Sequence, residues 1–142
     1  MLGIYHELLI KYNLKMSREI KFRAWDYVSE KMTYGVENAI GNTCFAFGHL
    51  IHDNDVEVTQ FTGLKDKNDK DIYEGDIVVF DRGVGNWTGK RMETTHEIIF
   101  NEEVFAFVLK YGSGYIKLRK HWNYIYEVIG NTRENPELLA TT

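Results

Sequence analysis

The chain has 142 residues, which allows one globular domain or at most two very small ones. Hydrophobic residues make up 44%, charged residues 27% and aromatic residues 14%, so a disordered or collagen-like chain is excluded. With 17 Lys and Arg against 21 Asp and Glu, the formal net charge is −4, which argues against a dedicated nucleic-acid coat. A single Cys excludes a disulfide scaffold and a cysteine-based structural zinc site and favours reduced cytosol.

Residues 1–15 predict an amphipathic helix, because Tyr5, Leu8, Leu9 and Tyr12 recur at the spacing of one helical face. A helix this short must dock on the body or on another subunit to persist. The alternative is a frayed leader segment. No stretch approaches the roughly 18 apolar residues of a membrane span, and no secretory signal is seen. We therefore expect a cytoplasmic protein without membrane contact.

From Ile20 onward, apolar residues recur with a period of two, which predicts β-strands. A polar hairpin tip is expected at 65–71 and a glycine-containing surface loop, with an exposed Trp87, at 82–90. Residues 41–51 fit neither period. The predicted strands are 20–25, 32–36, 55–61, 77–80, 96–100, 104–111, 115–119 and 122–130.

After the last of these strands, Asn135 and Pro136 predict an N-cap and the first position of a one-turn helix through Leu139. Seven or eight short strands, with turn signals about every ten residues, indicate a mainly β fold. The expected architecture is a compact antiparallel sheet or a small SH3-like barrel, with a short C-terminal helical turn and the N-terminal helix.

Five segments, taken together and in order, resemble the YopX-like family of phage and prophage proteins. They are IKFRAWD (20–26), QFTGLKDKN (60–68), IYEGDIV (72–78), EVIGN (127–131) and ENPELL (134–139). The resemblance implies a mainly β protein encoded by phages or prophages of low-GC Gram-positive bacteria, and it supplies no catalytic residue. Such proteins usually begin shortly before the first segment, which implies a β domain over 16–142 and an extension over 1–15.

Templates for catalysis and cofactor binding fail on this sequence. The string GVGNWTGK has Val84 where a phosphate-binding loop needs glycine and is followed by Arg91 where that loop needs Ser or Thr. Cys44 lies in an apolar stretch, and Ser113 lies in a Gly-Ser-Gly turn without a strand-to-helix elbow. We therefore expect no cofactor and no catalytic residue recognisable from the sequence.

One cluster has the composition of a metal site. His49 and His52 are followed by Asp53 and Asp55, and Cys44 is near in sequence. On a strand the two histidines would face opposite sides, so a shared metal requires a turn or helix between them. The alternative is a polar loop around the histidines.

A second cluster combines cations with aromatic rings, which suits single-stranded nucleic acid. The candidate binding residues are Tyr115, Lys117, Arg119, Lys120 and Trp122. The alternative is a solvated strand face whose aromatic residues fill the core.

The expected function is a non-catalytic binding or assembly module of a phage or prophage, acting as a homo-oligomer or with a phage or host protein. One alternative is a single-stranded nucleic-acid binder that uses the face around Lys117 and Arg119. Another is an enzyme with a site assembled from dispersed residues, for which a deep pocket gathering His96, Glu97 or Asp76 would be the sign.

Overall fold

The computed structural model describes residues 18–38, 47–84 and 89–140. The strands are β1 (Phe22–Asp26), β2 (Lys31–Tyr34), β3 (Val56–Lys65), β4 (Asp71–Tyr73), β5 (Asp76–Val84), β6 (Arg91–Asn101), β7 (Ala106–Tyr111), β8 (Gly114–Lys117) and β9 (Tyr126–Asn131). The short helices are η1 (Val36–Asn38), α2 (Phe47–Leu50), η2 (Lys120–Ile125) and η3 (Pro136–Leu139). The helix predicted in residues 1–15, Cys44 and Trp87 lie outside the described residues.

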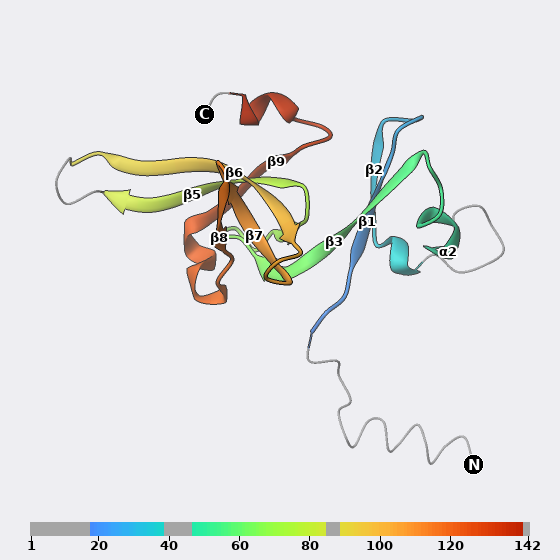
Figure 1. Ribbon diagram of the computed structural model, residues 1–142, viewed down its shortest axis with the longest axis horizontal. Helices are drawn as coiled ribbons and strands as arrows, with labels where there is room; N and C mark the ends of the chain where they lie inside the picture. The colour runs from blue at the N-terminus through green and yellow to red at the C-terminus, as the bar shows by residue number, and fades with distance from the viewer. Residues whose placement is uncertain (1–17, 39–46, 85–88, 141–142) are drawn as a thin grey trace, which may run out of the picture.

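The strands form two antiparallel sheets, which occupy opposite ends of the molecule in Figure 1. One has the order β2-β1-β3-β4, and the other has the order β8-β7-β6-β5-β9 and curls into a half-barrel. The prediction of a mainly antiparallel β fold is confirmed, with the strands divided between two sheets. Within the described part of the chain, no helix is long and apolar enough to cross a membrane.

The long strand β3 connects the two ends of the molecule (Figure 1). Residues 56–60 pair with β1, whereas Phe61 and Lys65 pair with β4. In β1, Phe22 and Ala24 pack toward one apolar cluster, while Arg23 and Trp25 are buried on the opposite face. This is the alternation that the sequence predicts for a strand covered on both sides.

The main core fills the concave side of the half-barrel. The half-barrel strand β5 pairs with β6 on one side and with β9 on the other. The apolar, β-branched sequence of 77–80 suits this position, because both neighbours are strands and most of its side chains are buried. The buried residues of this core are Ile72, Val78, Phe80, Ile98, Leu109 and Tyr126.

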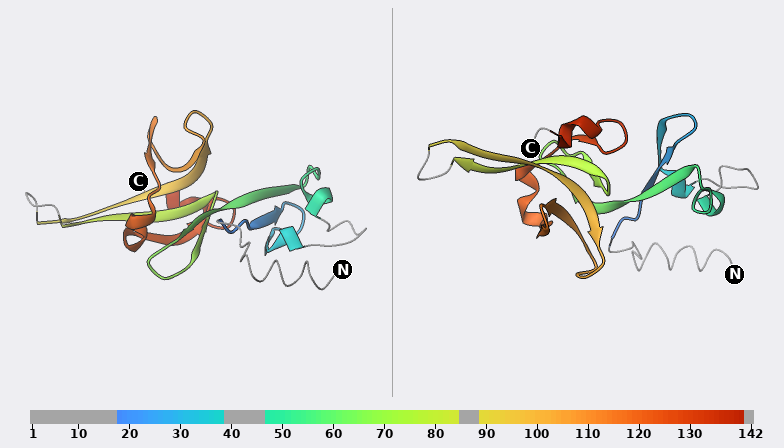
Figure 2. Two further views of the ribbon diagram at one scale, coloured as in Figure 1. Left: turned by 90° about the horizontal axis from the view of Figure 1, so that it is seen from below. Right: turned by 45° about the horizontal axis from the view of Figure 1, so that its top comes forward.

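Beyond the core, β5 and β6 continue as a two-stranded arm formed by residues 81–84 and 91–95 (Figures 1 and 2). The β5–β9 pairing ends at Phe80 and the β6–β7 pairing begins at Ile98, so, within the described residues, 81–84 and 91–93 pair only with each other, while 94–95 pair with 79–80 at the base of the arm. The register shifts between Asp81 and Val84, and Gly83 has a φ of +77° at this bulge.

Two local expectations are wrong. Residues 82–84 continue β5 instead of belonging to a loop. The strand predicted over 122–130 begins only at Tyr126, because 120–125 form η2, which turns Trp122 onto the core. The predicted C-terminal helical turn is confirmed as η3, with Asn135 at its N-cap and Pro136 in its first turn, although the Asn135 side chain makes no cap hydrogen bond.

The hairpin tip at 65–71 is confirmed, since β3 ends at Lys65 and β4 begins at Asp71. Asp69 adopts the left-handed backbone with a φ of +64°. Asp is among the residue types that tolerate this conformation.

Candidate functional site

A buried ion pair joins the two sheets. Arg23 of β1 donates from Nη1 to Asp76 Oδ1 of β5 at 2.6 Å, and both side chains are 3% exposed. The guanidinium also donates to Thr59 Oγ1 at 3.1 Å and to the Glu74 carbonyl at 2.8 Å. Its Cζ lies 4.9 Å from the centroid of the Tyr73 ring. Arg23 therefore contacts β3, β4, the turn between β4 and β5, and the start of β5.

The ion pair lines a cavity of about 530 Å³ between the sheets. Burial raises the pKa of the Asp76 carboxyl, while Arg23 and the Tyr73 amide act in the opposite direction. Both carboxyl oxygens accept hydrogen bonds, Oδ1 from Arg23 and Oδ2 from the Tyr73 amide at 2.8 Å. Asp76 thus acts as a buried acceptor that links β1 to the backbone at the start of β5.

The five segments that carry the family resemblance meet at this junction. Asp66 accepts hydrogen bonds within its own turn and, through Oδ2, from the Val128 amide at 2.9 Å. Gly130 leaves room for η3, since a Cβ there would lie 2.6 Å from Asn135 Oδ1 and 2.8 Å from Leu138 Cδ1. Together with Arg23–Asp76, these contacts assign the quoted segments a role in holding the sheets and η3 together.

A second cavity, of about 570 Å³, is lined by His96 and Glu97 of β6 together with Lys110. His96 Nδ1 lies 2.9 Å from the Lys110 carbonyl oxygen, and Nε2 lies 2.7 Å from Thr94 Oγ1. If Nδ1 donates to the carbonyl, Nε2 is the acceptor of the Thr94 hydroxyl proton. Both ring nitrogens are therefore occupied by the protein itself.

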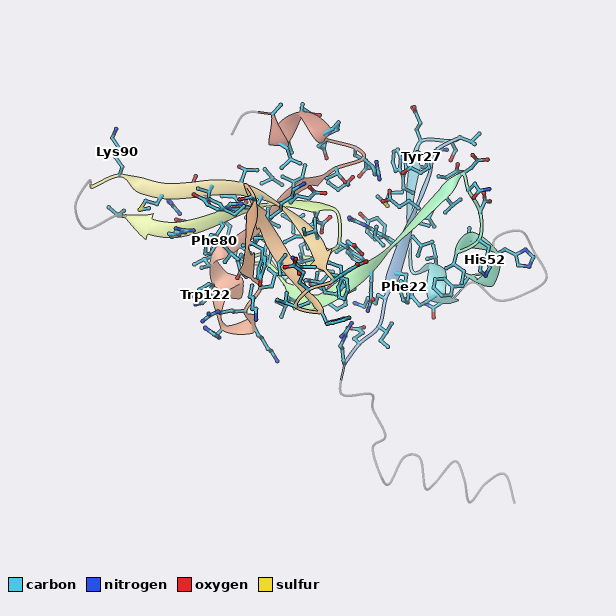
Figure 3. All side chains as sticks on the ribbon, in the orientation of Figure 1. Phe22, Tyr27, His52, Phe80, Lys90 and Trp122 are labelled. Carbon is cyan, nitrogen blue, oxygen red and sulfur yellow. The ribbon has the colours of Figure 1, made fainter. Side chains whose placement is uncertain are left out.

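An aromatic row crosses the concave side of the half-barrel next to the arm. It runs from Tyr111 through His96 and Phe80 to Trp122, with ring centroids 5.6, 6.4 and 6.0 Å apart in that order. Figure 3 shows Phe80 and Trp122 together at the end of the half-barrel from which the arm extends. Tyr111, at one end of the row, is 57% exposed.

Two arginines lie on this row. Arg82 Cζ is 5.1 Å from the Phe80 centroid, and Arg119 Cζ is 4.6 Å from the Trp122 centroid. The backbone of Arg119 is fixed by the buried Tyr126, whose hydroxyl accepts from the Arg119 amide at 3.3 Å. Burial raises the pKa of Tyr126. We call Tyr111, His96, Phe80, Trp122, Arg82 and Arg119 the cationic–aromatic row.

The structure divides the predicted nucleic-acid residues between two faces. Arg119 and Trp122 come together on the core side. Ile116 packs on the core, so its neighbours Tyr115 and Lys117 point to the opposite face of β8. Lys120 is exposed at the start of η2. Sequence reasoning missed Arg82, because the glycines around it indicate a loop.

The predicted metal ligands lie at the other end of the molecule. His49 is in α2 and His52 follows it; both are exposed, and Figure 3 shows His52 pointing outward. The His52 amide donates to the His49 carbonyl at 3.1 Å, so a turn does separate the two residues. Among the described residues there is no group of three or more His, Cys, Asp or Glu arranged to hold a metal ion. A metal site at His49 and His52 stays a prediction.

Comparison with known proteins adds a family and a fold. The family model described as "YopX protein" matches residues 21–140. The crystal structure of protein EF1440 from Enterococcus faecalis is similar, with a TM-score of 0.59 and 29% sequence identity over 87% of this chain and 99% of that one. No curated protein matches the chain.

Proposed function

Since the chain belongs to the YopX protein family, we propose that it is a non-catalytic binding or assembly module encoded by a phage or prophage and acting in the cytosol of a bacterial host. The arm of residues 81–84 and 91–95 is the observation that carries this proposal. A two-stranded ribbon is only marginally stable by itself in water. This one nevertheless exposes apolar side chains, with Val84 62% and Met92 46% exposed.

A projecting ribbon with exposed apolar residues is suited to packing against another protein surface. A second copy of this chain is the partner that we expect, because most soluble oligomers contain identical subunits. The arm is held in shape by its own polar contacts: Arg91 pairs with Asp81 and, at 2.9 Å, with Glu93. The apolar side chains therefore stay presented without an apolar core beneath them.

The enzyme hypothesis receives less support from the two cavities. Asp76 and His96 both line cavities, as an active site would require, but their polar atoms are engaged by neighbouring protein groups. Glu97 lies 3.7 Å from Lys110 Nζ. A general base must lie within hydrogen-bond reach of the substrate proton, and these groups are instead directed at neighbouring protein atoms.

Light scattering across a wide concentration range tests the assembly proposal. The wild type is expected to show a mass of two or more chains, and Val84→Ser with Met92→Gln is expected to shift it to the monomer. The matched control is Ile51→Ser, which removes an apolar side chain that is 51% exposed at the other end of the molecule. A monomeric wild type, or an unchanged mass in the arm variant, would contradict self-assembly through the arm.

A further inference from the structure

The base of the arm carries two guanidinium groups that are positioned by aromatic rings. Arg82 lies against Phe80, and Arg119 lies against Trp122. Within the part of the chain that the structure describes, neither arginine forms an ion pair with a carboxylate, in contrast to Arg23, Arg91 and Arg133. An aromatic platform orients the guanidinium plane and leaves N–H groups at its edge for bidentate contact with phosphate.

Three carboxylates on strands of the half-barrel are paired with other cations. Asp81 pairs with Arg91, Glu97 with Lys110, and Glu127 with Lys67. The negative charge of the whole chain is therefore not concentrated opposite the cationic–aromatic row. Local positive charge is what attracts a phosphate backbone, and net charge is a weaker guide.

The exposed ring of Tyr111 supplies the second feature of the row. Tyr111 contacts His96, which in turn contacts Phe80, so the tyrosine lies on the same side of the sheet as the two arginines. A ring that is 57% exposed offers a surface on which an unpaired base can stack. Bases in a duplex are already stacked and do not present their faces in this way.

We propose that a single-stranded nucleic acid binds across the cationic–aromatic row, with its phosphates on Arg82 and Arg119 and a base stacked on Tyr111. This site goes beyond the proposed assembly through the arm, because it uses the exposed side chains around the buried Phe80 and His96 and not Val84 or Met92. It also differs from the face predicted from the sequence, since Tyr115 and Lys117 point away from it.

Fluorescence anisotropy with labelled 12-nucleotide DNA and RNA strands at low salt tests the site. We expect the variant with Arg82→Gln and Arg119→Gln to bind about tenfold more weakly than the wild type. The slope of log K against log salt should fall by about 1.4, at about 0.7 for each lost phosphate contact on a single strand. Tyr111→Ser should weaken binding about fivefold or more, with Tyr111→Phe close to the wild type.

Two single-charge variants serve as controls. Lys31→Gln removes an exposed cation from β2 in the other sheet, and Lys117→Gln removes one from the opposite face of β8. Both should bind as the wild type does. Far-ultraviolet circular dichroism should show that every variant is folded.

Several results would overturn the proposal. They are no binding by the wild type, unchanged affinity in the double arginine variant, an equal loss in either lysine control, or a duplex that binds as tightly as a single strand. Light scattering of Tyr111→Ser separates this site from the assembly proposal, since Tyr111 belongs to β7 and lies outside the arm, so the mass of this variant should equal that of the wild type. Loss of nucleic-acid binding and loss of assembly are thus observed independently.

Discussion

Arg23 and Asp76 are 53 residues apart in sequence, and their side chains meet at 2.6 Å between the two sheets. Both side chains are buried, and each also binds the backbone near the turn between β4 and β5. Arg23 donates to the Glu74 carbonyl, and Asp76 accepts from the Tyr73 amide. The pair therefore fixes the turn that leads into β5 of the half-barrel as well as the position of β1.

Arg23→Met should destabilise the protein by about 3–5 kcal/mol, because it leaves the Asp76 carboxylate buried without its cation. The free energy of unfolding in urea measures the effect. Lys65→Met is the control and should cost less than about 1 kcal/mol, since Lys65 is 43% exposed and pairs with Asp69 at 3.3 Å and with Asp71 at 3.6 Å. Equal losses in the two variants would mean that burial of the Arg23–Asp76 pair is irrelevant to stability.

Asp66→Asn should cost about 1–3 kcal/mol, because an amide can replace only one of the two accepting oxygens. Oδ1 accepts from the amides of Asn68 and Lys70, and Oδ2 accepts from Val128. With the Asn oxygen kept in the turn, its NH₂ group would face the Val128 N–H. Asp69→Asn at the exposed tip should change the unfolding free energy by less than about 0.5 kcal/mol. A smaller loss for Asp66→Asn than for Asp69→Asn would refute this account.

Gly130→Ala should displace η3 and cost about 1–3 kcal/mol, since the added Cβ would lie within 2.9 Å of three atoms of Asn135 and Leu138. Thermal unfolding and the nuclear magnetic resonance shifts of the η3 amides measure the two effects. Gly48→Ala in α2 is the matched substitution, because no heavy atom lies within 4 Å of its Cβ position. It should be neutral or stabilise the protein by up to about 1 kcal/mol. Undisturbed η3 shifts in Gly130→Ala would contradict the close approach.

Glu57→Gln should reduce the loss of stability on acidification. The hydrogen bond from Arg133 is the main cause that holds the pKa of Glu57 below its ordinary value of 4.5. Stability from this contact is therefore present above pH 4.5 and lost as the pH falls below it. The pair is more than one third exposed, so its contribution should be below about 1 kcal/mol.

Urea unfolding of Glu57→Gln at intervals between pH 6 and pH 3 provides the comparison. The variant should be less stable than the wild type at pH 6, and the gap should narrow toward pH 3. Glu103→Gln, at an exposed turn, should follow the wild-type curve. If the difference in unfolding free energy between the two proteins stays constant with pH, the Arg133 contact is not the source of the pH dependence.

Much of the sheet structure is predictable from alternation alone. In β1 the residues on either side of Arg23 pack toward the opposite face, and a period of two records that directly. The strand prediction is wrong over 120–125. Trp122 and Tyr126 fit a period of two, but η2 is the element that brings Trp122 onto Phe80. That requirement comes from tertiary packing, which outweighs local β propensity.

The sites are less predictable than the strands. Arg119 and Trp122 are close in sequence, and their pairing could be anticipated. Arg82 joins them only because β5 continues past Phe80 and because η2 folds back over it. The partition of Lys117 and Arg119 between two faces likewise depends on where β8 ends, which is among the weakest features of a sequence pattern.

Asp66 and Lys67 cover the outer edge of β9. On the outer side of β9, the Val128 amide is bound by Asp66 and the Tyr126 carbonyl by the Lys67 amide at 3.0 Å. A strand from another molecule would have to displace both hydrogen bonds before it could pair with β9. The β9 edge is thereby protected against strand addition, which removes one route to an open-ended fibre.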